Sequence, residues 1–146
     1  MKKAILLLFS SFLLITCSDI DQCTSDSGLT YMVITFHDAE TKTSKKSGFR
    51  IFEAGSTTQF GLSDDSLAVG LPLDPMDTSL TFLFDTDTLD YTLKVRYDPE
   101  FSLFDPGCDP SLIFTGLDTL NSTFDSTAII GRVTDRLLPK NIEVYF

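Results

Sequence analysis

The segment LDYTLKVRY, residues 89–97, decides the class of fold. Every second residue in it is apolar, and polar or charged residues occupy the positions between. The apolar residues are Leu89, Tyr91, Leu93, Val95 and Tyr97, and the residues between them are Asp90, Thr92, Lys94 and Arg96. Successive side chains of a β-strand point to opposite faces, so this period of two predicts a strand with one buried face.

The same period recurs on both sides of this segment. It is present in Leu67, Val69, Leu71 and Leu73, in Leu80, Phe82 and Phe84, and in Ile142, Val144 and Phe146. The segment LTYMVITFH, residues 29–37, is apolar on both phases and is therefore expected to be a central strand. Segments 49–52, 111–114 and 126–133 are further short candidates.

Turn residues separate these segments, for example at Asp98-Pro99 and Asp105-Pro106-Gly107. Of the 21 acidic residues 17 are Asp, whose short side chain bonds the nearby backbone in turns. Residues 29–146 are therefore predicted to form a single all-β domain, an antiparallel immunoglobulin-like β-sandwich of about seven or eight short strands. The alternative is a small outer-membrane barrel, which needs alternating strands of about 9–11 residues that only 89–97 approaches.

The first sixteen residues resemble a secretory signal. Met1, Lys2 and Lys3 precede an apolar run, residues 4–15, that only Ser10 and Ser11 interrupt. A transmembrane helix needs about 20 apolar residues, so this run is too short to span. We therefore expect residues 1–16 to be a signal peptide of the lipoprotein type.

The sequence Leu14-Ile15-Thr16-Cys17 is similar to the lipobox of bacterial lipoproteins. In that motif the signal is cleaved before the Cys, which carries diacylglycerol on its thiol and an acyl chain such as palmitate on its amino group. Two or more acyl chains give stable anchoring, whereas one gives marginal binding. Cys17 is therefore the predicted lipidation site, and residues 17–28 the predicted tether.

Lipidation leaves Cys23 and Cys108, the other two of the three cysteines. Disulfides persist in the oxidising compartments outside the cytosol, so these two are predicted to form one. Closing this loop would stabilise the fold by roughly 4 kcal/mol in the chain-entropy description. The alternative is a metal site, which needs more ligands than two thiols and the single imidazole, His37.

Charge excludes several classes of partner. Without Lys2 and Lys3 the chain has 9 basic and 21 acidic residues, a formal charge of −12. Such a surface disfavours nucleic acid and anionic lipid. We expect a domain in contact with the membrane through its N-terminal lipid.

Several motifs occur in a characteristic order along most of the mature chain. They are the lipobox, Cys23-Thr24, VITFHDAETK (33–42), DSLAVGLPL (65–73), the alternating strand that ends at Tyr97, Cys108 before LIFTGLDTL (112–120), and NIEVYF (141–146). In this the chain resembles an uncharacterised family of small Bacteroidota-type lipoproteins, defined as a domain of unknown function. The resemblance implies a sandwich fold and the outer membrane as location. It also suggests an outer-membrane β-barrel protein as partner.

Acidic residues after Cys17, as in Ser18-Asp19-Ile20-Asp21, resemble an export signal to the cell surface, and a plain acidic linker at the periplasmic face is the alternative.

Two groups of residues suggest additional sites. Asp85, Asp87 and Asp90 alternate as the ligands of calcium loops do, although turn positions between two strands explain them as well. The triplets that begin at Asp65, Asp87, Asp118 and Asp125 resemble the Asp-Ser/Thr-apolar acceptor of O-glycosylation in exported Bacteroidota-type proteins. The predicted acceptors are Ser66, Thr88, Thr119 and Ser126.

No catalytic arrangement stands out. His37 is the only imidazole, no serine lies in a nucleophile-elbow context, and none of the many carboxylates forms a distinctive pair. We therefore expect no enzyme and no cofactor, calcium aside. The predicted function is that of an interaction or accessory subunit, as of an outer-membrane barrel complex. The alternative is a carbohydrate- or calcium-dependent ligand-binding module at the cell surface.

Overall fold

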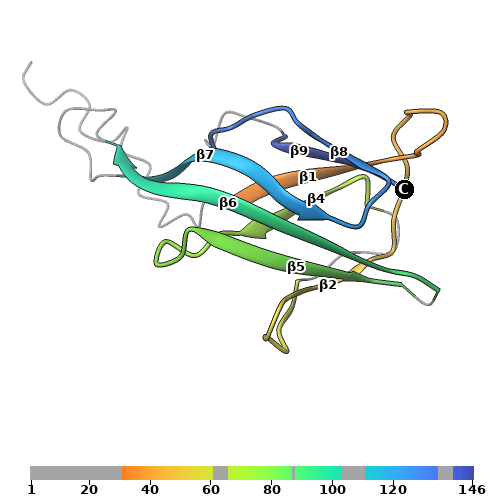
Figure 1. Cartoon of the computed structure of the whole chain (residues 1–146), viewed down its shortest axis with the longest axis horizontal. Helices are drawn as coiled ribbons and strands as arrows, with labels where there is room; N and C mark the ends of the chain where they lie inside the picture. Colours follow the sequence, from red (N-terminus) through yellow and green to blue (C-terminus); the bar gives the residue numbers. More distant parts are fainter. Residues whose placement is uncertain (1–30, 61–65, 87, 103–110, 135–139) are drawn as a thin grey trace, which may run out of the picture.

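The computed structural model describes residues 31–60, 66–86, 88–102, 111–134 and 140–146, and in them the chain is an all-β sandwich (Figure 1). The strands are β1 (Tyr31–His37), β2 (Arg50–Glu53), β3 (Gln59–Phe60), β4 (Ala68–Pro72), β5 (Ser79–Asp85), β6 (Asp90–Ser102), β7 (Ser111–Ser122), β8 (Ser126–Ile129) and β9 (Ile142–Tyr145). The sandwich predicted from periodicity is confirmed, and the two-residue β3 is the strand that periodicity misses. Within the described ranges no helix has the length and apolar character to cross a membrane.

One sheet has four strands in the order β4-β1-β9-β8. β1 lies between β4 and β9, as expected for a central strand, and its buried phase is Met32, Ile34 and Phe36. The pairing of β1 with β9 is parallel, whereas the other pairings between strands are antiparallel. The sequence predicts an antiparallel sandwich, and this one parallel pair differs from it.

Asn141 sets the register of the parallel pair. Its backbone N–H donates to Val33 O (2.8 Å), and its side-chain Oδ1 accepts the N–H of Val33 (2.9 Å). Its Nδ2 donates to the carbonyls of Val133 (3.0 Å) and Gly131 (3.4 Å). The side chain is 1% exposed, and these bonds satisfy a polar group whose burial would otherwise be costly.

The other sheet has five strands in the order β3-β2-β5-β6-β7. In β6 the alternation read from the sequence holds for Leu93, Val95 and Tyr97, which are fully buried, while Tyr91 is half-buried. Leu89 precedes β6 and is 59% exposed, so the buried phase begins later than periodicity suggests.

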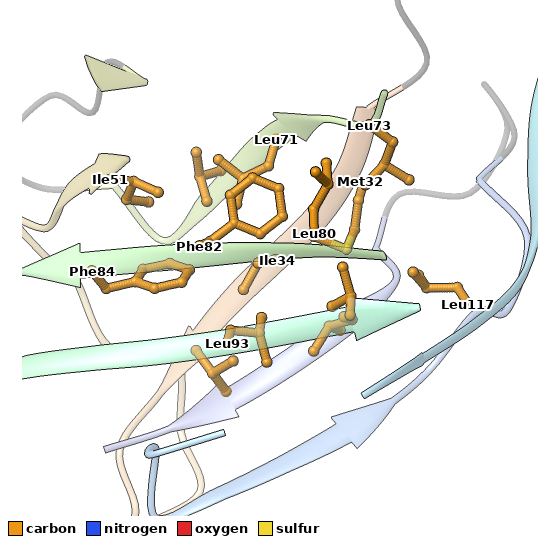
Figure 2. Close-up of a cluster of buried hydrophobic side chains, with 14 of the residues drawn as sticks. Met32, Ile34, Ile51, Leu71, Leu73, Leu80, Phe82, Phe84, Leu93 and Leu117 are labelled. Carbon is orange, nitrogen blue, oxygen red and sulfur yellow. The ribbon is translucent and has the colours of Figure 1, made fainter. Parts of the chain in front are cut away.

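The inward phases of the two sheets meet in one hydrophobic core. Figure 2 shows side chains of both sheets packed together, among them Met32 and Ile34 from β1, and Phe82 and Phe84 from β5. Tyr97 is the largest fully buried side chain, and its hydroxyl donates to Asp74 O at 3.0 Å. Burial raises the pKa of Tyr97 to about 12, because the ionised phenolate would lose its hydration.

Two irregularities in β7 change which of its residues face the core. The register with β6 shifts between Lys94 and Val95 and again between Arg96 and Asp98. Gly116 lies at the second shift with φ +60°, a conformation that glycine adopts without strain. As a result Phe114 and Leu117, three residues apart, are both buried. Such a pair breaks strict alternation, and for that reason periodicity predicts only the segment 111–114 of this strand.

β6 and β7 continue beyond the rest of their sheet (Figure 1). The pairing of β5 with β6 begins at Ser79 opposite Arg96, and past that point β6 pairs with β7 alone. We call residues 98–102 and 111–115 the ribbon. The predicted turn at Asp98-Pro99 is wrong, because both residues lie inside β6. Pro99 fits there because Phe114, its partner, bonds Thr134 on the far side of β7, so the position without an N–H faces the open edge of β6.

The strand directions give the molecule two different ends (Figure 1). The ribbon end comprises Tyr31, the β4–β5 turn (73–78) and the ribbon, because Tyr31 pairs with Pro72 and the N–H of Tyr97 donates to Thr78 O (3.0 Å). The loop end comprises the loop 38–48, the β5–β6 connection, the β7–β8 turn and Phe146.

Candidate functional site

The loop 38–48 is held in place by Asp38, the first residue after β1. Its Oδ1 accepts the N–H of Thr41 (2.9 Å), the N–H of Glu40 (3.1 Å) and the hydroxyl of Thr41 (3.1 Å). These bonds, the backbone bond from Thr41 foremost, hold the pKa of Asp38 below its ordinary value. The loop then passes through Lys42, which has φ +58°. A non-glycine residue in this region is uncommon. The Lys42 ammonium lies 4.6 Å from the ring centroid of Tyr145, within the range of a cation–π contact.

Beside this loop lies a group that we call the polar cluster, which consists of Thr35, His37, Lys42, Glu143 and Tyr145. β1 and β9 bring its members together, because Thr35 pairs with Glu143 and His37 with Tyr145 in the parallel register. Thr35, His37, Glu143 and Tyr145 occupy the outward phase of the two strands, opposite the buried phase of Ile34 and Phe36, and Lys42 reaches the cluster from the loop 38–48. The cluster is therefore a direct consequence of the β1–β9 pairing.

Hydrogen bonds and charge tie the polar cluster together. The Tyr145 hydroxyl donates to Glu143 Oε2 (2.8 Å), and Lys140 Nζ lies 3.2 Å from Glu143 Oε1. The bond from Tyr145 is the main cause that lowers the pKa of Glu143, and the same bond raises the pKa of Tyr145. Glu143 is thus held ionised and Tyr145 protonated.

His37 lies within the same cluster with its side chain 12% exposed. Its Nε2 is 3.2 Å from Thr35 Oγ1 and 3.8 Å from Glu143 Oε1, and its ring centroid is 5.2 Å from that of Tyr145. Its Nδ1 is buried, with no hydrogen-bond partner among the described residues. With donors, a fixed carboxylate and aromatic rings side by side, the cluster can bind a polar partner group.

Sequence reasoning found part of this cluster. It singled out His37 as the single imidazole, but not Glu143, Tyr145 or the role of Lys42. Glu143 and Tyr145 are the polar phase of the last predicted strand, so alternation alone placed them on an outer face. Their meeting with His37 depends on the parallel pairing, which leaves no signal in a single sequence.

The predicted calcium residues lie at the β5–β6 connection. Asp85 pairs with Asp90 across the strands, and its Oδ2 is 2.9 Å from a guanidinium nitrogen of Arg50. The turn itself is closed by Thr86, whose hydroxyl donates to Leu89 O at 2.6 Å. Asp87 lies outside the described residues. Across the described part of the chain, no three His, Cys, Asp or Glu side chains are grouped to hold a metal ion.

The predicted glycosylation acceptors differ in accessibility. Thr88 and Ser126 are exposed, and Ser66 is half-buried beside Ser47, with which it forms a bridge. Thr119 faces inward opposite Val95, and its Oγ1 is buried with no hydrogen-bond partner in the described part of the chain. In the folded domain an enzyme therefore reaches Thr88 and Ser126 more readily than Thr119.

The predictions for the cysteines and the N-terminus are not tested. Cys17, Cys23 and Cys108 lie outside the described residues, as do the predicted signal peptide (1–16) and tether (17–28). Lipidation at Cys17 and a Cys23–Cys108 disulfide remain predictions.

The ribbon end carries a different kind of surface. Phe101, on the ribbon, is 79% exposed, and Met76, in the β4–β5 turn, is 89% exposed. Tyr31 at the start of β1 is 48% exposed. Large apolar side chains left in water at one end of a domain mark a candidate contact surface.

Comparisons of the chain with models of protein families, with curated proteins and with solved structures returned no match.

Proposed function

We propose that this protein is a non-enzymatic lipoprotein of the bacterial outer membrane, anchored through Cys17. In this role it is an interaction or accessory subunit of a complex that contains an outer-membrane β-barrel protein. The apolar run and lipobox-like sequence support the anchor, and the acidic surface is compatible with a domain outside the cytoplasm.

The observation that carries the proposal is the separation of the two ends. The chain passes from the predicted tether into β1 at Tyr31, which belongs to the ribbon end. The polar cluster and the loop 38–48 lie at the other end of β1. An anchor upstream of Tyr31 would therefore leave the polar cluster pointing away from the point of attachment, where a partner can reach it.

The chemistry of the polar cluster indicates the kind of partner group. The Lys42 ammonium and the Tyr145 ring offer a charge and an apolar surface, and the carboxylate of Glu143 accepts hydrogen bonds. Internal bonds fix these groups, so binding would cost little side-chain entropy. A polar loop of a protein partner, with acidic and aromatic residues, fits this arrangement.

Site-specific photo-crosslinking in intact producing cells tests the proposal. A photoreactive amino acid replaces Lys42 in one variant and Lys94 in the other; both lysines are exposed, and Lys94 lies on the outward phase of β6. We expect a covalent adduct with an outer-membrane β-barrel protein from position 42 and none from position 94. The same adduct should disappear in Cys17→Ala, which cannot be lipidated.

Two outcomes contradict the proposal. An adduct that is equally strong in Cys17→Ala would show that the anchor plays no part in the contact. If position 42 gives no adduct with an outer-membrane protein, the accessory role at this surface is wrong.

A further inference from the structure

The strongest unexplained feature outside the polar cluster is the exposure of Phe101. It follows Tyr97 and Pro99 on the same phase of β6, and Tyr97 is fully buried in the core. The pairing of β5 with β6 begins at Ser79 opposite Arg96, so β5 does not extend along β6 beyond Arg96. Phe101 therefore lies on the face of β6 that points into the core further back along the strand, but it is beyond the end of that core. Its partner across the ribbon is Leu112.

Met76 is presented at the same end by a closed turn. Its N–H donates to Asp74 Oδ1 (2.8 Å), and the N–H of Asp77 donates to Asp74 O (3.2 Å). The same Asp74 carbonyl accepts the Tyr97 hydroxyl at 3.0 Å, which ties the turn to β6. Within β6, Phe101 is four residues beyond Tyr97.

The ribbon is itself held in shape. The hydroxyl of Thr115 donates to Glu100 Oε1 at 2.6 Å across the strands. At the base of the ribbon the N–H of Thr134 donates to Phe114 O (2.8 Å), and the N–H of Phe114 donates to Thr134 Oγ1 (3.1 Å). Phe101 and Met76 are therefore displayed from fixed backbone, which lowers the entropic cost of a contact that covers them both.

We propose that the ribbon end lies against the lipid bilayer, with Phe101 and Met76 in its interfacial region. The inference rests on the proposed anchor at Cys17, which would attach the chain upstream of this same end. Thirteen residues separate Cys17 from Tyr31. Whatever their conformation, they span at most about 45 Å, so Tyr31 would be kept within that distance of the membrane.

The side chains at this end suit the interfacial region. Burial of Phe and Met side chains away from water is favourable in free energy. The half-exposed Tyr31 has an apolar ring and a polar hydroxyl, which suits the boundary between lipid and water. The β4–β5 turn also carries Asp74 and Asp77, and the ribbon carries Asp98 and Glu100, so this end would repel anionic lipid. The lysines that would attract anionic lipid, Lys42, Lys45 and Lys46, belong to the loop end. The expected lipid is therefore zwitterionic.

The chain contains no tryptophan, so a single introduced one reports on its own surroundings. The experiment uses the full lipidated chain, reconstituted in phosphatidylcholine vesicles with or without brominated acyl chains. The test variant is Phe101→Trp, and the matched control is Leu89→Trp, at an exposed apolar position of the loop end. An unchanged thermal unfolding midpoint checks that each variant folds.

We expect the emission of Phe101→Trp to shift to shorter wavelength on reconstitution and to lose intensity with brominated lipid. Leu89→Trp should retain the emission of a water-exposed indole in both kinds of vesicle. Quenching should be weaker in the double variant Phe101→Trp with Met76→Asn. It should also be weaker in vesicles of brominated phosphatidylglycerol than in vesicles of brominated phosphatidylcholine.

The outcomes separate this inference from the proposed function. If the chain is lipidated and floats with the vesicles but Phe101→Trp is not quenched, the docking is wrong and the anchor stands. A chain whose N-terminal peptide carries no lipid and which does not float overturns both. A blue shift that depends on protein concentration, without quenching by brominated lipid, would show that a second copy covers Phe101, and it would overturn the lipid contact.

Discussion

The two ends of the sandwich are built from the same alternating strands, yet they are closed in different ways. At the loop end both sheets are present, and six rings form an aromatic cluster: Phe36, Phe49, Phe84, Tyr91, Phe124 and Phe146. At the ribbon end β6 and β7 extend beyond the rest of their sheet. Tyr97 and Phe101 lie on the same face of β6, yet Tyr97 is buried and Phe101 is exposed. The comparison shows that periodicity predicts which side chains share a face, whereas burial depends on whether a second sheet lies opposite.

The largest effect is expected for Phe49 in the aromatic cluster. Its ring centroid lies between 4.9 and 6.0 Å from those of Phe36, Phe84, Tyr91, Phe124 and Phe146, and the side chain is 2% exposed. Phe49→Ala should lower the free energy of unfolding by about 3–5 kcal/mol, because it leaves a cavity in a packed core.

The matched variant at the other end is Phe101→Ala. It should change the free energy of unfolding by no more than about 0.5 kcal/mol, since the side chain is 79% exposed. Urea denaturation of both variants measures the difference. Equal losses would mean that Phe101 belongs to a core, and the contrast between the two ends would be lost.

Tyr97, where the core meets the ribbon, should make the protein sensitive to alkali. Its pKa in the folded chain is raised from 10.0 to about 12, so the folded state holds its proton at a pH where the unfolded state has released it. A raised pKa means that the contribution is complete below pH 10 and is lost as the pH rises towards 12. The free energy of unfolding should therefore fall by roughly 2 kcal/mol by pH 12.

The control for this prediction is Tyr97→Phe. It removes both the titrating group and the hydrogen bond to Asp74 O, so it should be less stable at neutral pH by about 1 kcal/mol and show a shallower decline above pH 10. The pH dependence is measured by urea titrations at a series of pH values. If the free energy of unfolding falls equally in both proteins above pH 10, groups other than Tyr97 cause the loss.

A smaller effect is expected for Gly116, which shapes the ribbon. A Cβ at this position would lie 2.8 Å from Asp98 Oδ2, the mobile end of an exposed side chain, so the backbone at φ +60° is the main obstacle. Gly116→Ala should cost about 1–2 kcal/mol of stability, as expected for an L-residue in the left-handed region. Gly116→Asn should cost less, because Asn adopts that region more readily.

The double variant Asp98→Ala with Gly116→Ala separates the two causes. If it recovers the stability lost in Gly116→Ala, then the contact with Asp98 and not the backbone accounts for the loss. Unfolding in urea gives all the required values.

Gly116 also shows where sequence reasoning about the fold ends. The strictly alternating segment 80–84 is predicted with nearly the bounds of β5, whereas β6 continues to Ser102, five residues beyond the predicted segment 89–97. In β7 an extra residue at each shift of register places Phe114, Leu117 and Thr119 inward, so no simple period remains. Asp98-Pro99 is the opposite case, because a dipeptide typical of turns is accommodated in a strand whose edge is open.

For the polar cluster the limit is of another kind. His37 is noticeable as the single imidazole, and Glu143 and Tyr145 are visible as the polar phase of the last strand. Their proximity depends on the parallel pairing of the first strand with the last, more than a hundred residues apart, and on the bonds of Asn141 that set its register. Local patterns predict faces of strands, but the choice of neighbour is made by the whole fold.

A small effect is expected at the polar cluster, where the ionised Glu143 should make the loop end sensitive to acid. The Tyr145 hydroxyl and, less strongly, Lys140 and His37 lower the pKa of Glu143, so the folded state releases its proton at a lower pH than the unfolded state. A lowered pKa means that the contribution is present above the unfolded value of 4.5 and is lost as the pH falls through the folded value.

Glu143→Gln keeps an oxygen that can accept from Tyr145, so it should lower the stability at neutral pH by less than about 1 kcal/mol and flatten the decline below pH 4.5. Urea titrations between neutral pH and pH 3 measure this decline for the unsubstituted chain and for Glu143→Gln. If the two proteins lose stability in parallel below pH 4.5, the acid sensitivity belongs to groups other than Glu143.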